Sequence, residues 1–469
     1  MRRIFKILLE SLSGEERDYT AMGIRRAIVL LSIPMIMEMG MEALFALVDT
    51  FFVSKLGDVA TATVGLTETL MVPVYSIAWG LGMGITAVVA RRSGEKDKDG
   101  ARVAAGQSLF LALVVGVVLA VPAVIAAPWL LHMMGAEPEV MVLAVPYARV
   151  MLASNLIVTL LFAMNAVFRG AGNPGIALRT LVIANGINCV LDPLLIFGVG
   201  PFPELGVQGA AVATTIGRGI GVAYLLWNLF RPGGAFAVVL PDLRPVAAVV
   251  GNIVKVSIGG IGQFLIASAS WVFLVRIVAD SGTAAVGGYT VAVRIIIVAL
   301  LPAWGMANAA ATLVGQNLGA QQPDRAQRSV WLCGHYNMVF MVLVTLFFWI
   351  GAPWIVSFFA QSAEADATAI RALRIISCGY FFYGYGMVLA QAFNGAGDSL
   401  TPTWLNAICF WAIEIPLAYV LAITLGLGPA GVFASVAISE SILAVLSGVL
   451  FQRGKWKAVK VYWLEVDLG

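Results

Sequence analysis

The sequence has few charged residues and almost no histidine. Of its 469 residues, 12% are charged, about half the share of an ordinary soluble domain. The two histidines, His132 and His335, lie far apart, and the four cysteines show no paired spacing such as C-x-x-C. This composition argues against a metal centre or a disulfide framework. The net charge of +3, without a basic face carrying interleaved aromatics, also argues against a nucleic-acid partner.

Hydrophobic residues make up 60% of the chain and are grouped in long runs. Windows of about 19 residues identify twelve apolar segments, nearly all long enough to cross a bilayer as helices. We therefore predict an all-α polytopic membrane protein with twelve transmembrane helices. The expected spans are 28–54, 62–90, 103–131, 140–168, 176–200, 206–230, 247–279, 284–315, 329–360, 369–393, 401–427 and 429–451.

Lysine and arginine are concentrated in the connections on one side of these segments. Most of the 29 basic residues lie there, including those of both termini. The positive-inside rule then predicts that both termini are cytoplasmic, in a multi-pass protein of the plasma membrane. The N-terminal stretch MRRIFKILLE has too short an apolar run for a signal peptide. We expect it to form a short helix that lies on the inner leaflet.

The chain contains an internal repeat. Trp79-Gly80-Leu81 recurs as Trp304-Gly305-Met306, and Phe168 to Gly172 recurs as Phe393 to Gly397, both at an offset of 225 residues. Six spans per half make the repeats parallel, with a central cavity expected on their pseudo-two-fold axis. The predicted parts are a cytoplasmic N-terminal segment (1–27), an N-lobe (28–230), a cytoplasmic linker (231–246), a C-lobe (247–451) and a cytoplasmic tail (452–469).

The first span carries three acids on one side. Glu38, Glu42, Phe45 and Asp49 lie within about 60° of one another on a helix. Each acid near the membrane centre costs about 2.5 to 3.5 kcal/mol on insertion scales, so the acids must face protein or water. Burial and mutual repulsion favour proton uptake by such carboxylates. The second repeat has Gln263, Ala267 and Leu274 at the equivalent positions, so the fold itself does not require the acids.

A second polar group lies in the fifth span, at Asn185, Asn188 and Asp192. These side chains share one side of a helix, and Pro193 leaves the carbonyl of Cys189 without its usual backbone donor. Carboxylate, amide and carbonyl oxygens together suit a small cation. Structural alternatives stay open: Glu38 and Glu42 as water-wetted residues without a role, and Glu68 and Asn165 as structural hydrogen-bonding groups.

Arg218 and Glu440 occupy equivalent positions in the sixth and twelfth spans, at an offset of 222 residues. They could pair across the two halves, but separate partners within each half are the favoured interpretation. Gly80 and Gly84 form a G-x-x-x-G pattern, which predicts close packing with a neighbouring helix.

Several motifs recur in a fixed order along the chain. They are S-I-P and V-D-T-F-F-V-S-x-L-G in the first span, the loop R-R-x-G, the turn F-R-G-A-G-N-P, N-x-x-x-D-P in the fifth span and L-G-V-Q-G-A-A-V-A-T in the sixth. Together they resemble the multidrug and toxic compound extrusion (MATE) family over nearly the whole chain. The resemblance implies an exporter of cationic or amphiphilic compounds that exchanges them for inward H+ or Na+ through a V-shaped pair of helix bundles.

The resemblance also implies roles for particular residues. The expected ion-coupling residues are Asp49, Asp192, Asn188, Glu42 and Asn165, with Asp49, Asn188 and Asp192 as a candidate Na+ site. The expected substrate cavity contains Phe45, Glu38, Glu68, Asn185 and Gln263. In relatives, position 42 is often an amide and position 45 is often a tyrosine. The glutamate at position 42 of this chain is therefore expected to bind protons more readily than an amide would. Because the seventh span has no acid, the chain resembles the prokaryotic DinF-like branch, and the N-lobe is expected to couple the ion.

Two other functions fit the sequence less well. A lipid-linked oligosaccharide flippase of the same superfamily would have extra terminal helices and a strongly cationic cavity, and neither is evident. An intramembrane enzyme is not supported, because H-E-x-x-H, G-x-S-x-G and paired Asp-rich motifs are absent. We therefore expect a monomeric prokaryotic transporter of small organic compounds that works in the lipid bilayer, has no enzymatic activity, and uses no cofactor other than H+ or Na+ as the coupling ion.

Overall fold

The computed structural model describes residues 10–12, 17–359 and 362–459, and this part of the chain contains helices and no strands. The first half contains α2 (Ile24–Ser54), α3 (Asp58–Glu95), α4 (Lys98–Met133), α5 (Pro138–Ala153), α6 (Asn155–Gly170), α7 (Pro174–Phe197) and α8 (Val207–Phe230). The second half contains η1 (Leu240–Leu243), α9 (Ala247–Ala279), α10 (Thr283–Gly319), α11 (Pro323–Ser357), α12 (Ala363–Ser377), α13 (Tyr380–Ala396), α14 (Leu400–Asn406), η2 (Ala407–Glu414), α15 (Ile415–Tyr419), η3 (Val420–Thr424), α16 (Pro429–Gln452) and η4 (Lys455–Ala458).

These helices form twelve spans. Among the described residues, eleven helical segments are long and apolar enough to cross a membrane, and α12 with α13 forms a twelfth span that is bent by 62°. The prediction of an all-α protein with twelve transmembrane helices is confirmed. Several helices extend past their predicted C-terminal ends, and α3 and α10 extend furthest, to Glu95 and Gly319. Charged or polar residues at a helix end can lie in water outside the bilayer, so a hydropathy window leaves them out of the predicted span.

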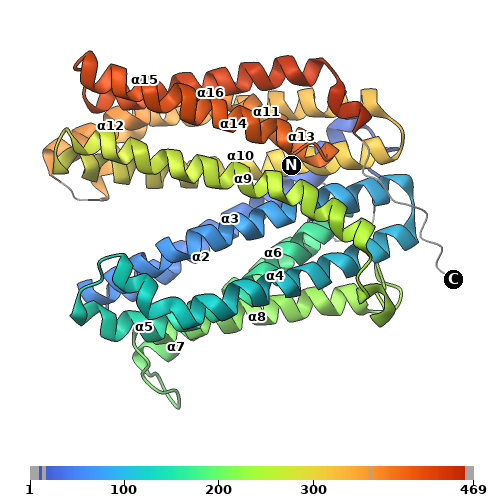
Figure 1. Ribbon diagram of the computed structural model, residues 1–469, viewed down its shortest axis with the longest axis horizontal. Helices are drawn as coiled ribbons and strands as arrows, with labels where there is room; N and C mark the ends of the chain where they lie inside the picture. The colour runs from blue at the N-terminus through green and yellow to red at the C-terminus, as the bar shows by residue number, and fades with distance from the viewer. Residues whose placement is uncertain (1–9, 13–16, 360–361, 460–469) are drawn as a thin grey trace.

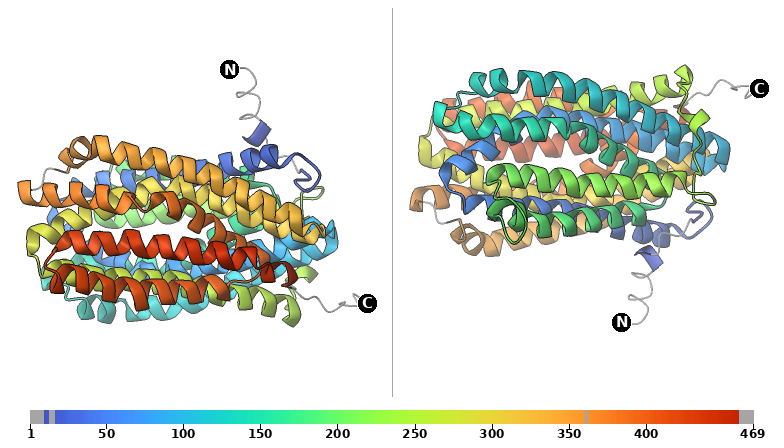
Figure 2. Two further views of the ribbon diagram at one scale, coloured as in Figure 1. Left: turned by 90° about the horizontal axis from the view of Figure 1, so that it is seen from above. Right: turned by 90° about the horizontal axis from the view of Figure 1, so that it is seen from below.

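The helices are arranged as two bundles. In Figure 1, α2 to α8 form the lower bundle and α9 to α16 the upper one, with most helices running along the longest axis of the molecule. The views from above and below in Figure 2 show the same lengthwise alignment of the helices. Buried apolar side chains fill each bundle, and residues of α2 such as Leu31 and Met35 pack into the core of the C-lobe. The structure therefore has the two-lobe arrangement expected from the repeat.

The two lobes approach each other most closely along α3. A Cβ atom on Gly80 would lie 2.4 Å from the backbone nitrogen of Ile261, and one on Gly84 would lie 2.3 Å from Ser257 Oγ. Ile261 and Ser257 belong to α9, so the predicted close packing is confirmed and the partner helix is in the other lobe. Towards the end of α3, a Cβ atom on Gly94 would lie 2.0 Å from the carbonyl oxygen of Gln316 in α10. Glycines therefore allow the lobes to meet at the end where α3 and α10 terminate.

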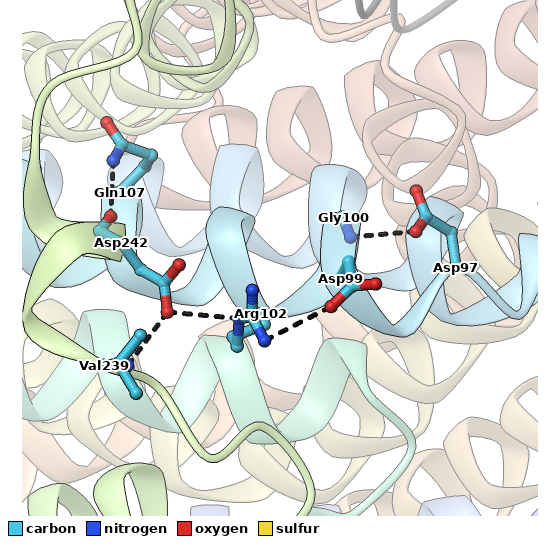
Figure 3. Close-up of polar contacts among 7 residues, drawn as sticks. All are labelled: Asp97, Asp99, Gly100, Arg102, Gln107, Val239 and Asp242. Atoms are coloured by element: carbon cyan, nitrogen blue, oxygen red, sulfur yellow. Dashed lines mark hydrogen bonds and ion pairs between the residues drawn. The ribbon is translucent and has the colours of Figure 1, made fainter. Parts of the chain in front are cut away.

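The connection between the lobes is held against α4, as Figure 3 shows. Gln107 Nε2 donates to the carbonyl oxygens of Asp242 (2.6 Å) and Arg244 (2.7 Å), and Gln107 Oε1 accepts from Val246 N (2.9 Å). The Asp242 carboxylate also lies 3.2 Å from Arg102 Nε. The proline-rich connection is thus fixed to the first lobe by one buried glutamine and an ion pair.

The segment before α2 bridges both lobes at the same end. Arg325, in the first turn of α11, donates to the carbonyl oxygen of Tyr19 (2.9 Å), and Asp18 lies 3.0 Å from Lys96 Nζ at the end of α3. A hydrogen bond from the Thr20 hydroxyl, together with the nearby ammonium of Lys96, lowers the pKa of Asp18 to about 2. The carboxylate is therefore ionised at neutral pH and contributes to this bridge.

Two spans of the C-lobe are irregular, which the sequence did not predict. The tenth span breaks between Ser377 and Tyr380, and the eleventh contains π-helical stretches at Ala407–Glu414 and Val420–Thr424. Pro416 lies between the π stretches and has no N–H for the helix ladder. Breaks and π-helices in membrane spans often accompany functional sites.

Candidate functional site

The three acids of α2 lie inside the N-lobe. Glu38 is 2% exposed and Asp49 9% exposed, and Glu42 is partly buried. Arg169 of α6 pairs with Glu38 at 2.5 Å between Nη1 and Oε1, and the charge of Arg218 in α8 acts on Glu42 and Asp49. The acids therefore face protein, as the cost of exposing a carboxylate to lipid requires.

Asp192 and Asn188 of α7 form the deepest part of this site. Both side chains are fully buried, and Asn188 Nδ2 donates to Asp192 Oδ1 (3.2 Å). Asp49 is near enough for its charge to act on Asp192. In the described part of the chain, Asp49 Oδ1, Asn188 Oδ1 and Asp192 Oδ2 are buried and have no hydrogen-bond partner. Open carboxylate and amide oxygens are acceptors for a proton or a hard cation.

A buried tyrosine that the sequence analysis missed lies beside these acids. Tyr147 of α5 is 2% exposed, and the charges of Asp49, Asp192 and Glu68 act on it. A single tyrosine in an apolar span has no pattern that distinguishes it from a packing residue. A hydroxyl group from a third helix thus lies within electrostatic range of the acids.

Phe45 lies under a buried guanidinium. Arg218 is 7% exposed, its Cζ lies 4.7 Å from the centre of the Phe45 ring, and its Nη1 donates to the Tyr75 hydroxyl (3.3 Å). A cation over an aromatic face is attracted by the ring quadrupole. Arg218 therefore has its partners in its own lobe, as favoured from the sequence, and not at Glu440.

Glu38 and Gln263, which we expected to line the substrate cavity, are buried and contact partners from equivalent helices that do line the cavity between the lobes. Gln263 Nε2 donates to Asn394 Oδ1 (2.9 Å), just as Glu38 pairs with Arg169. Both pairs join residues 131 positions apart. The same contact is thus an ion pair in the N-lobe and an amide pair in the C-lobe.

A polar cavity lies between the lobes, next to both pairs. It is lined by residues that include Trp79, Met83, Thr86 and Arg169 of the N-lobe, and Asn308, Thr312, Gln391 and Asn394 of the C-lobe. Met83 and Asn308 are equivalent under the repeat, so the cavity lies where the repeat predicts the pseudo-axis. Its charged lining residue is Arg169, which is neutralised by Glu38.

The remaining predicted residues lie around this core. Asn185 Nδ2 donates to the carbonyl oxygen of Met41 (2.7 Å) and joins α7 to α2. Glu68 is exposed on α3, and the charge of Arg294, across in α10, acts on it. Asn165 is 3% exposed, and nothing in the described residues hydrogen-bonds its Oδ1. The structure therefore brings Asp49, Asn188 and Asp192 together, while Asn165 has no hydrogen bond to them.

Metal-ligand clusters are not found in the part of the chain that the structure describes. No group of three or more His, Cys, Asp or Glu side chains there could hold a metal ion, and the four cysteines are unpaired. A Na+ ion at Asp49 and Asp192 would rely on amide and hydroxyl oxygens for its other ligands.

Two related helical lobes, with buried acids in one and a polar cavity between them, form the architecture of a membrane transporter. The model of the MatE family matches residues 34–194 and 261–420, one stretch in each lobe and more than half of the chain. The chain belongs to the MatE (MATE) family, whose members are transporters rather than enzymes.

Individual relatives match over most of their length. The chain is 25% identical to a probable multidrug resistance protein NorM of Thermotoga maritima, over 92% of this chain and 93% of that protein. It is also 25% identical to an FAD transporter of Shewanella oneidensis, over 84% of this chain and 87% of that protein. A multidrug resistance MATE transporter solved in an outward-facing conformation has 29% identity and a TM-score of 0.87, covering 96% of this chain and 98% of that one.

Proposed function

We propose that this protein exports cationic or amphiphilic organic compounds in exchange for inward H+, by alternating access. The observation that supports this proposal most strongly is the set of buried, unpartnered oxygens on Asp49, Asn188 and Asp192. Two carboxylates that interact in a buried site do not ionise together without cost, so one proton is shared readily between them. Glu42 and Asn165 are proposed as further members of the coupling site.

The proposed mechanism starts with proton uptake at Asp49 or Asp192 from the outer side. Protonation of Asp49 weakens its attraction to Arg218 and to any bound cation, because a neutral carboxyl group has no net charge to attract them. We propose that α2 then rearranges near Pro34, which lies within the helix, and that substrate is released. The membrane potential supplies about 2.3 kcal/mol per charge per 100 mV for the inward proton.

H+ is preferred over Na+ because of the residues in this site. Glu42 adds a carboxyl group that can bind H+. Phe45 contributes no oxygen atom to a Na+ coordination shell, which needs several oxygen ligands. Na+ at Asp49, Asn188 and Asp192 is the second candidate. The two ions are distinguished by the experiment below.

The substrate class is supported by the relatives' names and by the charges of the N-lobe. The NorM relative is named for multidrug resistance. In the N-lobe interior, the four acids Glu38, Glu42, Asp49 and Asp192 outnumber the two arginines that act on this group, Arg169 and Arg218. A net negative interior attracts cations. We propose that the substrate path beside the polar cavity is lined by Phe45, Glu38, Glu68, Asn185 and Gln263.

We further propose the orientation and the assembly. The end at which the lobes, the linker and the segment before α2 meet is assigned to the cytoplasm by its basic residues. The lobes are tightly packed there, which corresponds to an outward-facing state with both termini inside the cell. We propose that the protein is a monomer in the plasma membrane. Its proposed parts are the N-terminal segment (1–27), the N-lobe (28–230), the linker (231–246), the C-lobe (247–451) and the tail (452–469).

Dye efflux from proteoliposomes tests the function. Purified protein is reconstituted with a cationic dye inside, and an inward pH gradient or an inward Na+ gradient is imposed separately. We expect efflux with the pH gradient and little with the Na+ gradient. Efflux driven only by Na+ would replace the proton as the coupling ion, and efflux with neither gradient would reject the proposed antiport.

A further inference from the structure

Two opposite charges from different lobes lie at the same depth in the outer half of the spans. Glu68 of α3 and Arg294 of α10 are both exposed, although each lies inside an apolar span. α3 begins at Asp58 and α10 at Thr283, so both residues are about 15 to 16 Å along the axis from the outer end of their helices. The internal repeat gives the same depth, because Arg294 is equivalent to Thr69, the neighbour of Glu68.

Both side chains are on helix faces that are directed towards the other lobe. Glu68 precedes Trp79 by eleven residues, which places the two within about 20° of each other around a helix. The Trp79 ring lies 5.6 Å from the ring of Trp304 in α10. Arg294 precedes Asn308, which lines the cavity between the lobes, by fourteen residues and lies within about 40° of it. The two charges therefore lie on the outer side of this cavity, one from each lobe.

The two charges act on each other but are not paired in this structure. The cation whose charge acts on Glu68 is Arg294, while Glu68 in turn acts on an acid of its own lobe, Asp49. In the part of the chain that the structure describes, neither Glu68 nor Arg294 forms an ion pair. One turn from Glu68, a Cβ atom on Gly65 would meet nothing within 4 Å. Glu68 thus has open space beside it and its cation in the opposite lobe.

The exposure of these charges limits how the lobes can move. A charged side chain inside the bilayer costs about 2.5 to 3.5 kcal/mol on insertion scales, so both groups require water in the state that this structure represents. Alternating access requires the outer halves of the lobes to approach each other, which removes this water. Each charge would then be buried alone, at a high cost, unless the two charges join each other.

We propose that Glu68 and Arg294 form an ion pair that closes the outer side of the cavity when the transporter faces inward. This inference rests on the proposed alternating access and adds the residues of an outer gate to it. The Arg294 guanidinium donates to the Glu68 carboxylate across the pseudo-axis, and its planar shape matches both carboxylate oxygens. The pair carries no net charge, so the open gate adds no net charge to the path of a cationic substrate.

Distance measurements between two spin labels test this gate. The labels are attached to Asp58→Cys and Thr283→Cys, at the exposed first residues of α3 and α10, in full-length protein without its four native cysteines. In nanodiscs at acidic and at neutral pH, we expect a long and a short distance when positions 68 and 294 are unchanged. Glu68→Arg and Arg294→Glu each bring like charges together and should remove most of the short-distance population. The double variant restores an opposite pair and should restore that population.

The rate of pH-driven dye efflux from proteoliposomes provides a second readout. Each single charge reversal should slow efflux at least tenfold, and the double variant Glu68→Arg/Arg294→Glu should regain most of the wild-type rate. The double variant is the matched control, because it contains both substitutions. Size-exclusion profiles and melting temperatures show whether each variant is folded, and Arg294→Glu carries the test if Glu68→Arg does not fold.

The outcomes separate the gate from the proposed function. A short-distance population that both single reversals leave unchanged, or that the double variant does not restore, would overturn the gate and leave alternating access standing. Slow efflux in all three variants with unchanged distances would assign the two residues to substrate contact, which also overturns the gate. A single distance at both pH values would overturn alternating access, and the gate with it.

Discussion

At the scale of single residues, the two lobes differ in one equivalent contact. Glu38 and Arg169 form an ion pair in the N-lobe, where Gln263 and Asn394 form an amide pair in the C-lobe. The side chains of the ion pair are only 2% and 8% exposed, so water does not compensate either charge if the other is removed. Removing one member of a buried ion pair is therefore more costly than replacing both.

We expect Glu38→Gln to lower the free energy of unfolding by about 3 to 5 kcal/mol, because Arg169 would remain as a buried, uncompensated cation. The double variant Glu38→Gln/Arg169→Asn copies the C-lobe pair and should recover most of that loss. Denaturant or thermal unfolding of the purified variants measures both. A double variant no more stable than Glu38→Gln would contradict the equivalence of the two pairs.

The residues of the site were only partly predictable from the sequence. Asp49, Asn188 and Asp192 were found because a charged or amide group stands out in an apolar span. Arg169 is not among the predicted site residues, since its partner Glu38 is 131 residues away in the sequence. The internal repeat nevertheless held that signal, because Glu38 and Arg169 are both replaced by amides at the same offset of 225 residues.

At the scale of helices, the approach of α3 to α9 depends on glycine. A Cβ atom on Gly84 would lie 2.3 Å from Ser257 Oγ and 2.5 Å from the carbonyl oxygen of Ile253. On the same helix, a Cβ atom on Gly65 would meet nothing within 4 Å. These two positions therefore provide a matched pair for testing whether the lobes need this close contact.

We expect Gly84→Ala to lower the melting temperature and slow dye efflux at least several-fold, because the lobes can no longer close fully at this end. Gly65→Ala should leave the melting temperature unchanged or raise it, since alanine favours helix. Melting curves and efflux rates of the two variants are compared directly. Equal behaviour of both variants would show that the contact at Gly84 is not required.

The linker provides a second test at this scale. Gln107→Ala leaves the buried carbonyl group of Asp242 and the N–H group of Val246 without partners, so we expect a loss of about 1 to 3 kcal/mol in the free energy of unfolding. Arg102→Ala removes the ion pairs of a 32%-exposed arginine with Asp99 and Asp242. Because the Asp242 carboxylate keeps its hydrogen bond from Val239 N, we expect a cost of at most about 1 kcal/mol. Unfolding curves decide the order, and a larger loss for Arg102→Ala would refute this account of the linker.

Helix positions were predicted well, but irregular backbone was not. Hydropathy located the spans because a bilayer requires about 20 apolar residues per helix. It gave no sign of the break at Gly379 or of the π-helical stretch Ala407–Glu414, because both lie within continuous apolar sequence. Such irregularities depend on local backbone geometry and on tertiary contacts, which a hydropathy window does not record.

At the scale of the whole molecule, the repeat provides one scaffold with two different interiors. The N-lobe has its acids grouped around Asp49 and Asp192, with Arg218 as an internal cation. In the described part of the C-lobe, Glu440 lies among aromatic rings, and the charged group that acts on it is another acid, Glu414. We infer that ion coupling is a property of the N-lobe, so substitutions in the two lobes should have separable effects on transport.

The most direct test of that claim is the rate of cationic dye efflux from proteoliposomes under an inward pH gradient, with wild-type protein, Asp49→Asn and Asp192→Asn. We predict that each substitution reduces the rate at least tenfold, because an amide cannot take up and release the proton. Melting temperatures close to the wild-type value would show that the variants are folded. If both folded variants export dye at the wild-type rate, the N-lobe acids do not couple transport to protons.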